Sequence, residues 1–378
     1  MVSEEERNRR NLALREAMDK NGYALLILYG DSRWGKSGWV QYLFNYFLFN
    51  RQGYGVFPIN GEPSLIFPQR APLLSEQAGE KHVRADSGID DEHVNMSSFK
   101  KIMDDLGVKE GSKVGLVNYI DMPAAEYVDL VKNCPNVKFD DATSLFNSVR
   151  MIKSAEEIQY LRNSNLAAEH SFHNLLETLK VGADEKDVRA NALHALYKMG
   201  ARDSIFHAIN GQNGDCSPVP GLPGDSYIYN KNDVTIPIIE LCNLDGYWTE
   251  FSRVLCLGDM SDLTKRMNDV MEKTLELADE ILIPGITYGE IWDKVDTKVS
   301  KLDFHLQYIG HGIGTDVLEG PNILKGSTTT LEENMTIAFH PKILDKDEKS
   351  CTYVNDIYLV TNNGGKPLSA VPRAPMRI

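Results

Sequence analysis

The first 148 residues alternate between polar segments and short apolar runs. Residues 4–20 are rich in charged side chains and predict a surface helix, whereas the apolar run 23–29 (YALLILY) predicts a buried strand. Residues 113–118 predict a further strand, and residues 124–132 predict the helix that follows it. Because helices and strands that alternate along a chain are typical of an α/β domain, we predict one over residues 1–148.

Residues 34–67 predict an aromatic helix face followed by a β-hairpin. Segments 55–58 and 64–67 flank Asn60-Gly61, a dipeptide that favours the tight turn between two paired strands. The aromatic side chains that precede them predict a helix face packed on a sheet. These side chains are Trp34, Trp39, Tyr42, Phe44, Tyr46 and Phe47.

The second half, residues 149–378, predicts a second domain that opens with a long helix. The run Ser154-Ala-Glu-Glu157 has the pattern of a capping box, in which serine and glutamate satisfy each other's backbone amides at a helix start. We therefore place the domain boundary near residues 149–154.

A pattern within this domain repeats at an offset of 285 − 182 = 103 residues. Each copy begins with a glycine, Gly182 or Gly285, and has a helix-capping residue two positions later and an acid five positions later. Each copy also follows a long predicted helix and opens a second one. The repeat predicts two similar helix–helix–strand units packed around a pseudo-two-fold axis, which make one domain of curved antiparallel sheet covered by helices.

Composition and charge exclude several classes of function. The 378 residues carry a net charge of −14, which disfavours binding to nucleic acid or to anionic membranes. No run reaches the roughly 18 apolar residues of a membrane span, and the charged first ten residues lack the apolar stretch of a secretory signal. Five cysteines without a CxxC pair favour free thiols, so we expect a cytoplasmic protein.

Four side chains in the second domain are candidate catalytic groups. Glu240 and Glu250 lie in apolar, strand-like segments, where a carboxylate is costly unless it is paired or functional. His311 lies between glycines, which let a ligand approach closely, and His340 ends an apolar run before Pro341, which should stop the strand. The alternative explanations are an edge strand with its carboxylates in solvent, an incidental turn histidine and a buried core histidine. The P-loop, GxGxxG, GxSxG and HExxH motifs are absent.

Five segments of the second half form an ordered set of motifs. They are residues 151–157, 245–253, 310–321, 335–341 and 354–361. Together they resemble the creatinase/aminopeptidase P/prolidase family. The resemblance implies a C-terminal "pita-bread" domain with an internal duplication, preceded by a creatinase-like N-terminal α/β domain.

The same resemblance implies an altered metal site. Metallopeptidases of this family hold two metal ions with two Asp, one His and two Glu. Here the corresponding positions are occupied by Glu240, Glu250, His311, His340 and Asn355. Because an amide replaces the bridging carboxylate at Asn355, a dinuclear metal centre is doubtful.

Three functional interpretations remain open. The first resembles creatinase, a metal-free hydrolase of C–N bonds in small guanidino or amino-acid-like substrates. In it His311 or His340 acts as general acid and base beside Glu250 or Glu240, without a cofactor. The second is a hydrolase or lyase with one divalent metal ion at Glu250, His311 and His340. The third is a catalytically silent member that binds a ligand.

The resemblance also implies a homodimer and further substrate-binding positions. In creatinase-like dimers an arginine from the N-terminal domain of one subunit reaches the pocket of the other, and Arg51 resembles it. Glu319, Cys216 and Asn355 are the other candidate substrate-binding residues, although a structural thiol also explains Cys216. The expected partner is a small molecule, with no nucleic acid and no membrane.

Overall fold

The computed structural model describes residues 2–32, 36–48, 52–66, 94–221 and 226–378. The chain divides into two compact units, residues 1–150 and 151–378. Arg51 and Trp34 lie outside the described residues. Within the described ranges, no helix combines the length and the apolar character needed to cross a bilayer.

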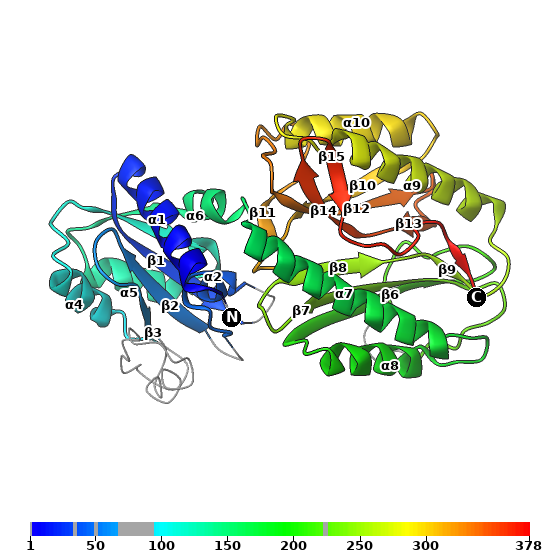
Figure 1. Ribbon diagram of the computed structural model, residues 1–378, viewed down its shortest axis with the longest axis horizontal. Helices are drawn as coiled ribbons and strands as arrows, with labels where there is room; N and C mark the ends of the chain where they lie inside the picture. The colour runs from blue at the N-terminus through cyan, green and yellow to red at the C-terminus, as the bar shows by residue number, and fades with distance from the viewer. Residues whose placement is uncertain (1, 33–35, 49–51, 67–93, 222–225) are drawn as a thin grey trace. The chain divides into compact units, whose positions relative to one another are not determined.

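The first unit is built on a five-stranded mixed sheet with the order β3-β2-β1-β4-β5 (Figure 1). The central strand β1 runs antiparallel to β2 and parallel to β4. The strands are β1 (Tyr23–Asp31), β2 (Gln52–Pro58), β3 (Ser64–Ile66), β4 (Lys113–Val117) and β5 (Lys138–Asp141).

Helices cover both faces of this sheet. Alternate residues of β1 point to opposite faces, so Leu26 and Leu28 pack with α1, α2 and α6, whereas Leu25 and Ile27 pack with α4 and α5. The helices are α1 (Glu4–Asn21), α2 (Gly38–Phe44), α4 (Ser97–Asp105), α5 (Ala124–Asn133) and α6 (Thr143–Arg150), with a 3-10 turn, η2 (Tyr119–Asp121).

These elements confirm the α/β architecture predicted for the first unit, and two local predictions are also correct. The hairpin prediction is correct, because β2 pairs antiparallel with β3 around the Asn60-Gly61 turn. The helix-face interpretation of the aromatic cluster is also correct for Trp39, which is fully buried on α2 against the sheet. Close approach of its ring requires glycine at Gly30 and Gly55, where a β-carbon would come within 2.5 Å and 2.4 Å of ring atoms.

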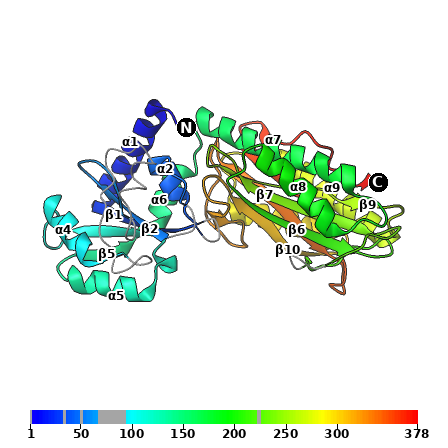
Figure 2. The same cartoon turned by 90° about the horizontal axis from the view of Figure 1, so that it is seen from below.

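The second unit has two sheets, each covered by its own pair of helices (Figures 1 and 2). The helices α7 (Ala155–Thr178) and α8 (Glu185–Lys198) pack on the first sheet. The helices α9 (Asp262–Ile281) and α10 (Tyr288–Ser300) pack on the second. The first sheet holds β6 (Asp203–Gly211), β7 (Val234–Cys242), β8 (Trp248–Ser252), β9 (Leu255–Cys256) and β16 (Met376–Arg377).

The second sheet repeats the arrangement of the first. It holds β10 (His305–Gly312), β11 (Glu319–Asn322), β12 (Thr336–Leu344), β13 (Cys351–Tyr353), β14 (Asp356–Thr361) and β15 (Gly364–Pro367).

The predicted duplication is confirmed by matching backbone contacts in the two halves. Gly182 and Gly285 both have positive φ, at +86° and +96°, and they donate their amides to Tyr229, just before β7, and to Leu331, just before β12. Asp184 caps α8 and Thr287 caps α10, the two positions expected from the pattern. The capping box at Ser154 is likewise present at the start of α7.

One local prediction was wrong. Pro341 does not end its strand, because β12 continues to Leu344 and Lys342 still pairs with Tyr308 and Tyr353. A register shift toward β10 lies between the Tyr308 and Gly310 pairings, next to His340 and Pro341. Such an irregularity accommodates a residue without an amide hydrogen inside a sheet.

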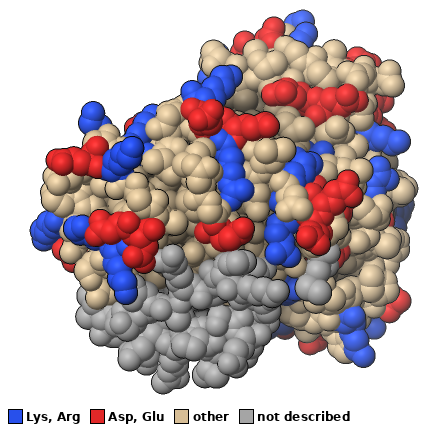
Figure 3. Space-filling view, turned by 60° about the vertical axis from the view of Figure 1, so that its left-hand side comes forward, with Lys and Arg blue, Asp and Glu red and all other residues tan. Residues whose placement is uncertain are grey.

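The surface of the described residues carries mixed charge. On the face drawn in Figure 3, lysine and arginine side chains are interspersed with aspartate and glutamate. This face offers no continuous basic surface to a polyanion, in keeping with the net charge of −14.

Candidate metal centre

The candidate centre is formed by side chains from both sheets of the second unit. Glu240 on β7 lies directly opposite Glu250 on β8, so the two carboxyl groups share one face of the first sheet. His311 lies near the end of β10, and His340 lies on the neighbouring strand β12. Asn355 follows β13, in the short break before β14.

Glu250 lies at the middle of this group. Its Oε1 atom is 3.2 Å from Nε2 of His311, and its Oε2 atom is 3.4 Å from Nε2 of His340. Asn355 Nδ2 donates a hydrogen bond of 2.8 Å to the same Oε2 atom. All four side chains are buried, so these interactions are little screened by water.

The ring of His311 is oriented by its backbone. Its Nδ1 atom lies 2.8 Å from the carbonyl oxygen of Gly312, and an N–H donated there leaves Nε2 directed at Glu250. Burial lowers the pKa of His311, but the carboxylate of Glu250 outweighs it, and the net shift is upward.

The pKa values of Glu250 and His340 are shifted downward. Burial would raise the pKa of Glu250, but the neighbouring charges of His311 and His340 outweigh it and hold that pKa at about 2. Burial lowers the pKa of His340 to about 4, so its imidazole is neutral near pH 7 and keeps a free lone pair. A carboxylate and a neutral imidazole are the forms that bind a cation.

Several polar atoms of the centre have no hydrogen-bond partner. Among the residues that the structure describes, both ring nitrogens of His340 and the Oδ1 atom of Asn355 are buried without one. Buried polar atoms are normally satisfied, so this set can accept a further ligand. Glu250, His311 and His340 each offer one ligand atom, and these atoms lie within 4.8 Å of one another. Two imidazoles and one carboxylate suit a divalent transition-metal ion.

Glu240 lies beside this set rather than within it. It is half-buried, and no described residue forms a hydrogen bond with its carboxyl group. Burial and the negative charge of Glu250 raise its pKa well above the usual range. Glu240 is therefore suited to carry a proton next to the centre.

Two tyrosines near the centre were missed in the sequence. The rings of Tyr308 and Tyr353 lie 5.0 Å and 5.4 Å from the ring of His340 and pack on it. Tyr308 precedes the Gly-His-Gly motif closely, but its contact with His340, 340 − 308 = 32 residues away, depends on the pairing of β10 with β12. Register of this kind is not visible in a short sequence window.

Two predicted substrate-binding residues make their contacts elsewhere. Glu319 forms a buried ion pair of 2.6 Å with Lys153 and accepts the amide of Thr315 at 2.7 Å, so both its oxygens are used within the protein. Cys216 is buried, and its thiol contacts the carbonyl oxygen of Ile209 and the sulfur of Cys351. Substrate-binding roles for these two residues gain no support from the structure.

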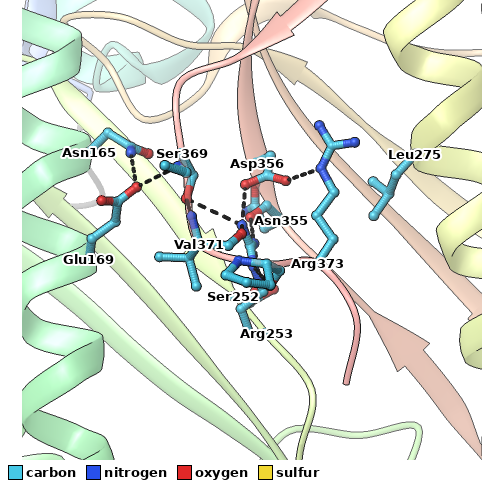
Figure 4. A network of polar contacts seen from close by, with 12 residues as sticks. Asn165, Glu169, Ser252, Arg253, Leu275, Asn355, Asp356, Ser369, Val371 and Arg373 are labelled. Atoms are coloured by element: carbon cyan, nitrogen blue, oxygen red, sulfur yellow. Dashed lines mark hydrogen bonds and ion pairs between the residues drawn. The ribbon is translucent and has the colours of Figure 1, made fainter. Parts of the chain in front are cut away.

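A buried arginine links β8, which carries Glu250, to the segment that contains Asn355. Ser252 and Asn355 form a β-bridge where the two sheets meet, and Arg253 donates to the carbonyl oxygens of both, at 2.8 Å and 3.1 Å. Arg253 also pairs with Asp356 at 2.8 Å (Figure 4). Its remaining donors bind the C-terminal segment, at the carbonyl oxygens of residues 371 and 372. This network fixes the spacing of the two strands at the centre.

Comparison with known proteins gives one family and several relatives. The model of Metallopeptidase family M24 matches residues 159–362, which include every residue of the centre. The chain is 28% identical over 229 residues to an Xaa-Pro dipeptidase of Lactobacillus helveticus, covering 59% of this chain and 61% of that protein. It is 25% identical over 325 residues to an Xaa-Pro dipeptidase of Pyrococcus horikoshii, covering 84% and 89%.

A solved structure gives the same fold. The recombinant prolidase from Thermococcus sibiricus superposes with a TM-score of 0.83 at 19% identity, and the match covers all of both chains. At this identity the similarity concerns the fold alone, which is the two-domain pita-bread architecture expected from the sequence.

Proposed function

The chain belongs to metallopeptidase family M24, and on that premise we propose a hydrolase with a single divalent metal ion. Glu250, His311 and His340 hold the ion, and the reaction cleaves a C–N bond in a small amino-acid-like substrate. The proposal rests on one observation: the ring nitrogens of His340 and the Oδ1 atom of Asn355 are buried near the Glu250 carboxylate without hydrogen-bond partners, and such atoms can bind a metal ion. Because these atoms can bind a cation, we prefer this proposal to the metal-free interpretation, the first of the three that the sequence left open.

One ion is favoured over two by the chemistry of Asn355. Its Nδ2 atom donates to Oε2 of Glu250, so the amide already engages one oxygen of this carboxylate. A neutral amide also lacks the charge with which a carboxylate bridges two cations. Glu240 is the other carboxyl group near the centre that could bind a second ion. Its raised pKa favours the protonated form, which is a poor metal ligand.

The side chains of the centre have separate tasks in hydrolysis. A divalent cation at the three ligands supplies Lewis-acid chemistry suited to cleavage of a C–N bond. Tyr308 and Tyr353 pack on His340 and keep its ring in place. The carboxyl group of Glu240 carries a proton that it can give to the leaving nitrogen, as a general acid. Burial of Glu250 excludes water from its interactions with the two histidines.

Metal analysis of the purified protein tests the proposal. We expect about one equivalent of a divalent transition metal. The variant His340→Ala should lose most of it, because only two of the three ligands would remain. His305→Ala is the matched control, since His305 is an exposed histidine on β10 and should leave the metal content unchanged. Two equivalents of metal, or unchanged metal content in His340→Ala, would contradict the proposal.

Activity assays then define the substrate. The relatives named Xaa-Pro dipeptidase suggest dipeptides with C-terminal proline, and the altered ligands suggest adding N-substituted and guanidino amino acids to the panel. The aligned region spans 61% of the Lactobacillus helveticus relative, so its substrate is part of the proposal. Chelation should abolish turnover, and addition of metal should restore it.

A metal-independent hydrolase is the second candidate. It is favoured by the ion pair of His311 with Glu250 at 3.2 Å, in which the raised pKa of His311 suits a general acid. Turnover that survives exhaustive chelation would select this candidate. Absence of turnover with retained ligand binding would instead indicate a silent member of the family.

The quaternary arrangement is also proposed from the resemblance. We expect a homodimer in which Arg51 contributes to substrate binding across the interface. Light scattering of the purified protein should give twice the chain mass, and Arg51→Ala should raise KM without lowering the melting temperature. A monomer, or an unchanged KM, would contradict this part.

A further inference from the structure

A lysine lies on the same sheet face as the candidate metal centre. Lys342 is on β12, two residues after His340, and its direct partners on the flanking strands are Tyr308 and Tyr353. Directly opposed residues point to the same face of a sheet, and the rings of both tyrosines pack on His340. Lys342 therefore faces the centre, about 7 Å along the strand from His340.

The charge of Lys342 is not matched by an acid. The side chain is half-buried, and its Nζ atom donates one hydrogen bond of 2.6 Å to the carbonyl oxygen of Pro218. No carboxylate among the described residues forms an ion pair with it. A partly buried cation without a counter-ion is costly. Two of its three N–H donors remain for a ligand.

Comparison of the two repeats shows that only the second sheet carries this positive charge at the equivalent pair of positions. The Lys342–Tyr353 pair of the second sheet stands where the first sheet has the Glu240–Glu250 pair, at offsets of 102 and 103 residues. At this pair of positions the first sheet therefore carries two carboxyl groups, and the second sheet carries the ammonium group of Lys342. A ligand between the two sheets would meet carboxyl groups on one side and an ammonium group on the other.

From this arrangement we propose that Lys342 binds the carboxylate of the substrate. The inference rests on the proposed hydrolase and names its substrate class: amino-acid-like molecules with a free carboxylate a few ångströms from the scissile C–N bond. An ammonium–carboxylate contact in a sheltered site has the strength of a charge-assisted hydrogen bond. Its loss should weaken binding about ten- to hundredfold.

A matched pair of probes tests the role of Lys342. Calorimetric titration of the metal-loaded, full-length protein should show tighter binding of L-proline than of L-prolinamide, which lacks the carboxylate. Lys342→Met should weaken the binding of L-proline about ten- to hundredfold and change the binding of L-prolinamide less than twofold. Lys342→Arg, which keeps the charge, should restore part of the discrimination. Lys366→Met, at an exposed lysine on β15 of the same sheet, should behave as wild type.

The outcomes separate this inference from the proposed function. Equal weakening of both probes, no weakening of either, or no binding of either probe to the wild-type protein would overturn the role of Lys342. Metal content, measured on the same samples, should be unchanged by Lys342→Met. A wild-type protein without metal would count against the hydrolase proposal, whatever the probes show.

Discussion

Arg253 and Asp356 form a fully buried ion pair of 2.8 Å. They are separated by 356 − 253 = 103 residues, the same offset that relates Gly182 to Gly285. The pair therefore joins equivalent positions of the two repeats, directly beside the bridge between Ser252 and Asn355. Glu250 lies on β8, two residues before this bridge, and Asn355 is part of it, so the internal symmetry and the candidate metal centre share one structural element.

Removing Arg253 should be severely destabilising. Arg253→Met leaves Asp356 with Arg373 alone and removes the donor from the carbonyl oxygens of residues 371 and 372. Breaking a buried pair of this kind costs about 3–5 kcal/mol. Urea denaturation of the metal-free protein measures the loss.

Arg377→Met provides the control for this prediction. Arg377 pairs with Asp259 in the same C-terminal segment, but both side chains are about two-thirds exposed or more. Its loss should cost less than about 1 kcal/mol. Similar losses in the two variants would contradict a special role for the buried pair.

Replacing Asn355 by aspartate should make stability depend on metal. Asn355→Asp keeps the size of the side chain but replaces an N–H donor 2.8 Å from Oε2 of Glu250 with a second negative charge. The metal-free variant should be less stable than wild type, because two buried carboxylates repel each other. A bound cation removes this repulsion, so metal should raise the melting temperature more in the variant than in wild type. An equal or smaller rise would contradict the assignment of Asn355 to the centre.

The stability of the metal-free protein should depend on pH through His311. The pKa of His311 is raised in the folded state, so the contribution of its pair with Glu250 is complete below the unfolded value of 6.5 and is lost as pH rises through the folded value. Glu250 has a lowered pKa, so its contribution is present above about 4.5 and is lost as pH falls toward 2. Denaturation between pH 6 and 9 with a chelator should show wild type losing more stability than His311→Gln.

The comparison with His311→Gln isolates this titration. His207 is half-buried, and burial lowers its pKa, so its contribution changes with pH in the opposite sense. Both proteins contain His207, and its effect cancels in the difference. A difference that is independent of pH would show that the His311–Glu250 pair is not charged in the folded protein.

The N-terminal core should not tolerate a methyl group at Gly55. The added β-carbon of Gly55→Ala would lie 2.4 Å from the ring of Trp39, which is fully buried and cannot move without displacing its neighbours. Overpacking of this kind costs about 1–3 kcal/mol. In a double-mutant cycle with Trp39→Leu, the smaller side chain should relieve part of that cost. Additive effects would indicate that the ring and the strand are not in contact.

Much of the fold could be predicted because its signals are local. The capping box at Ser154, the hairpin turn at Asn60-Gly61 and the repeated glycines at 182 and 285 each act through backbone geometry within a few residues. The structure shows each of these where the sequence placed it. Pro341 was misjudged because a shift in the pairing with β10 accommodates it, and pairing partners lie far away in sequence.

The candidate centre was only partly visible in the sequence. Glu250, His311 and His340 stand out because charged or imidazole groups interrupt apolar or glycine-rich segments. Tyr308 and Lys342 do not stand out in this way, and their place at the centre depends on which strands lie side by side. The unsatisfied atoms of His340 and Asn355 also become apparent only once their surroundings are known.

The sequence by itself determined the helices and most strands, the duplication, the family and three of the groups at the centre, because these depend on spacing along the chain. The tertiary structure alone decided that Glu319 is paired with Lys153, that Arg253 joins the two repeats and that Lys342 lies between Tyr308 and Tyr353. Such relations depend on distances between atoms of remote segments. Packing and strand register set these distances, and no local pattern of residues encodes them.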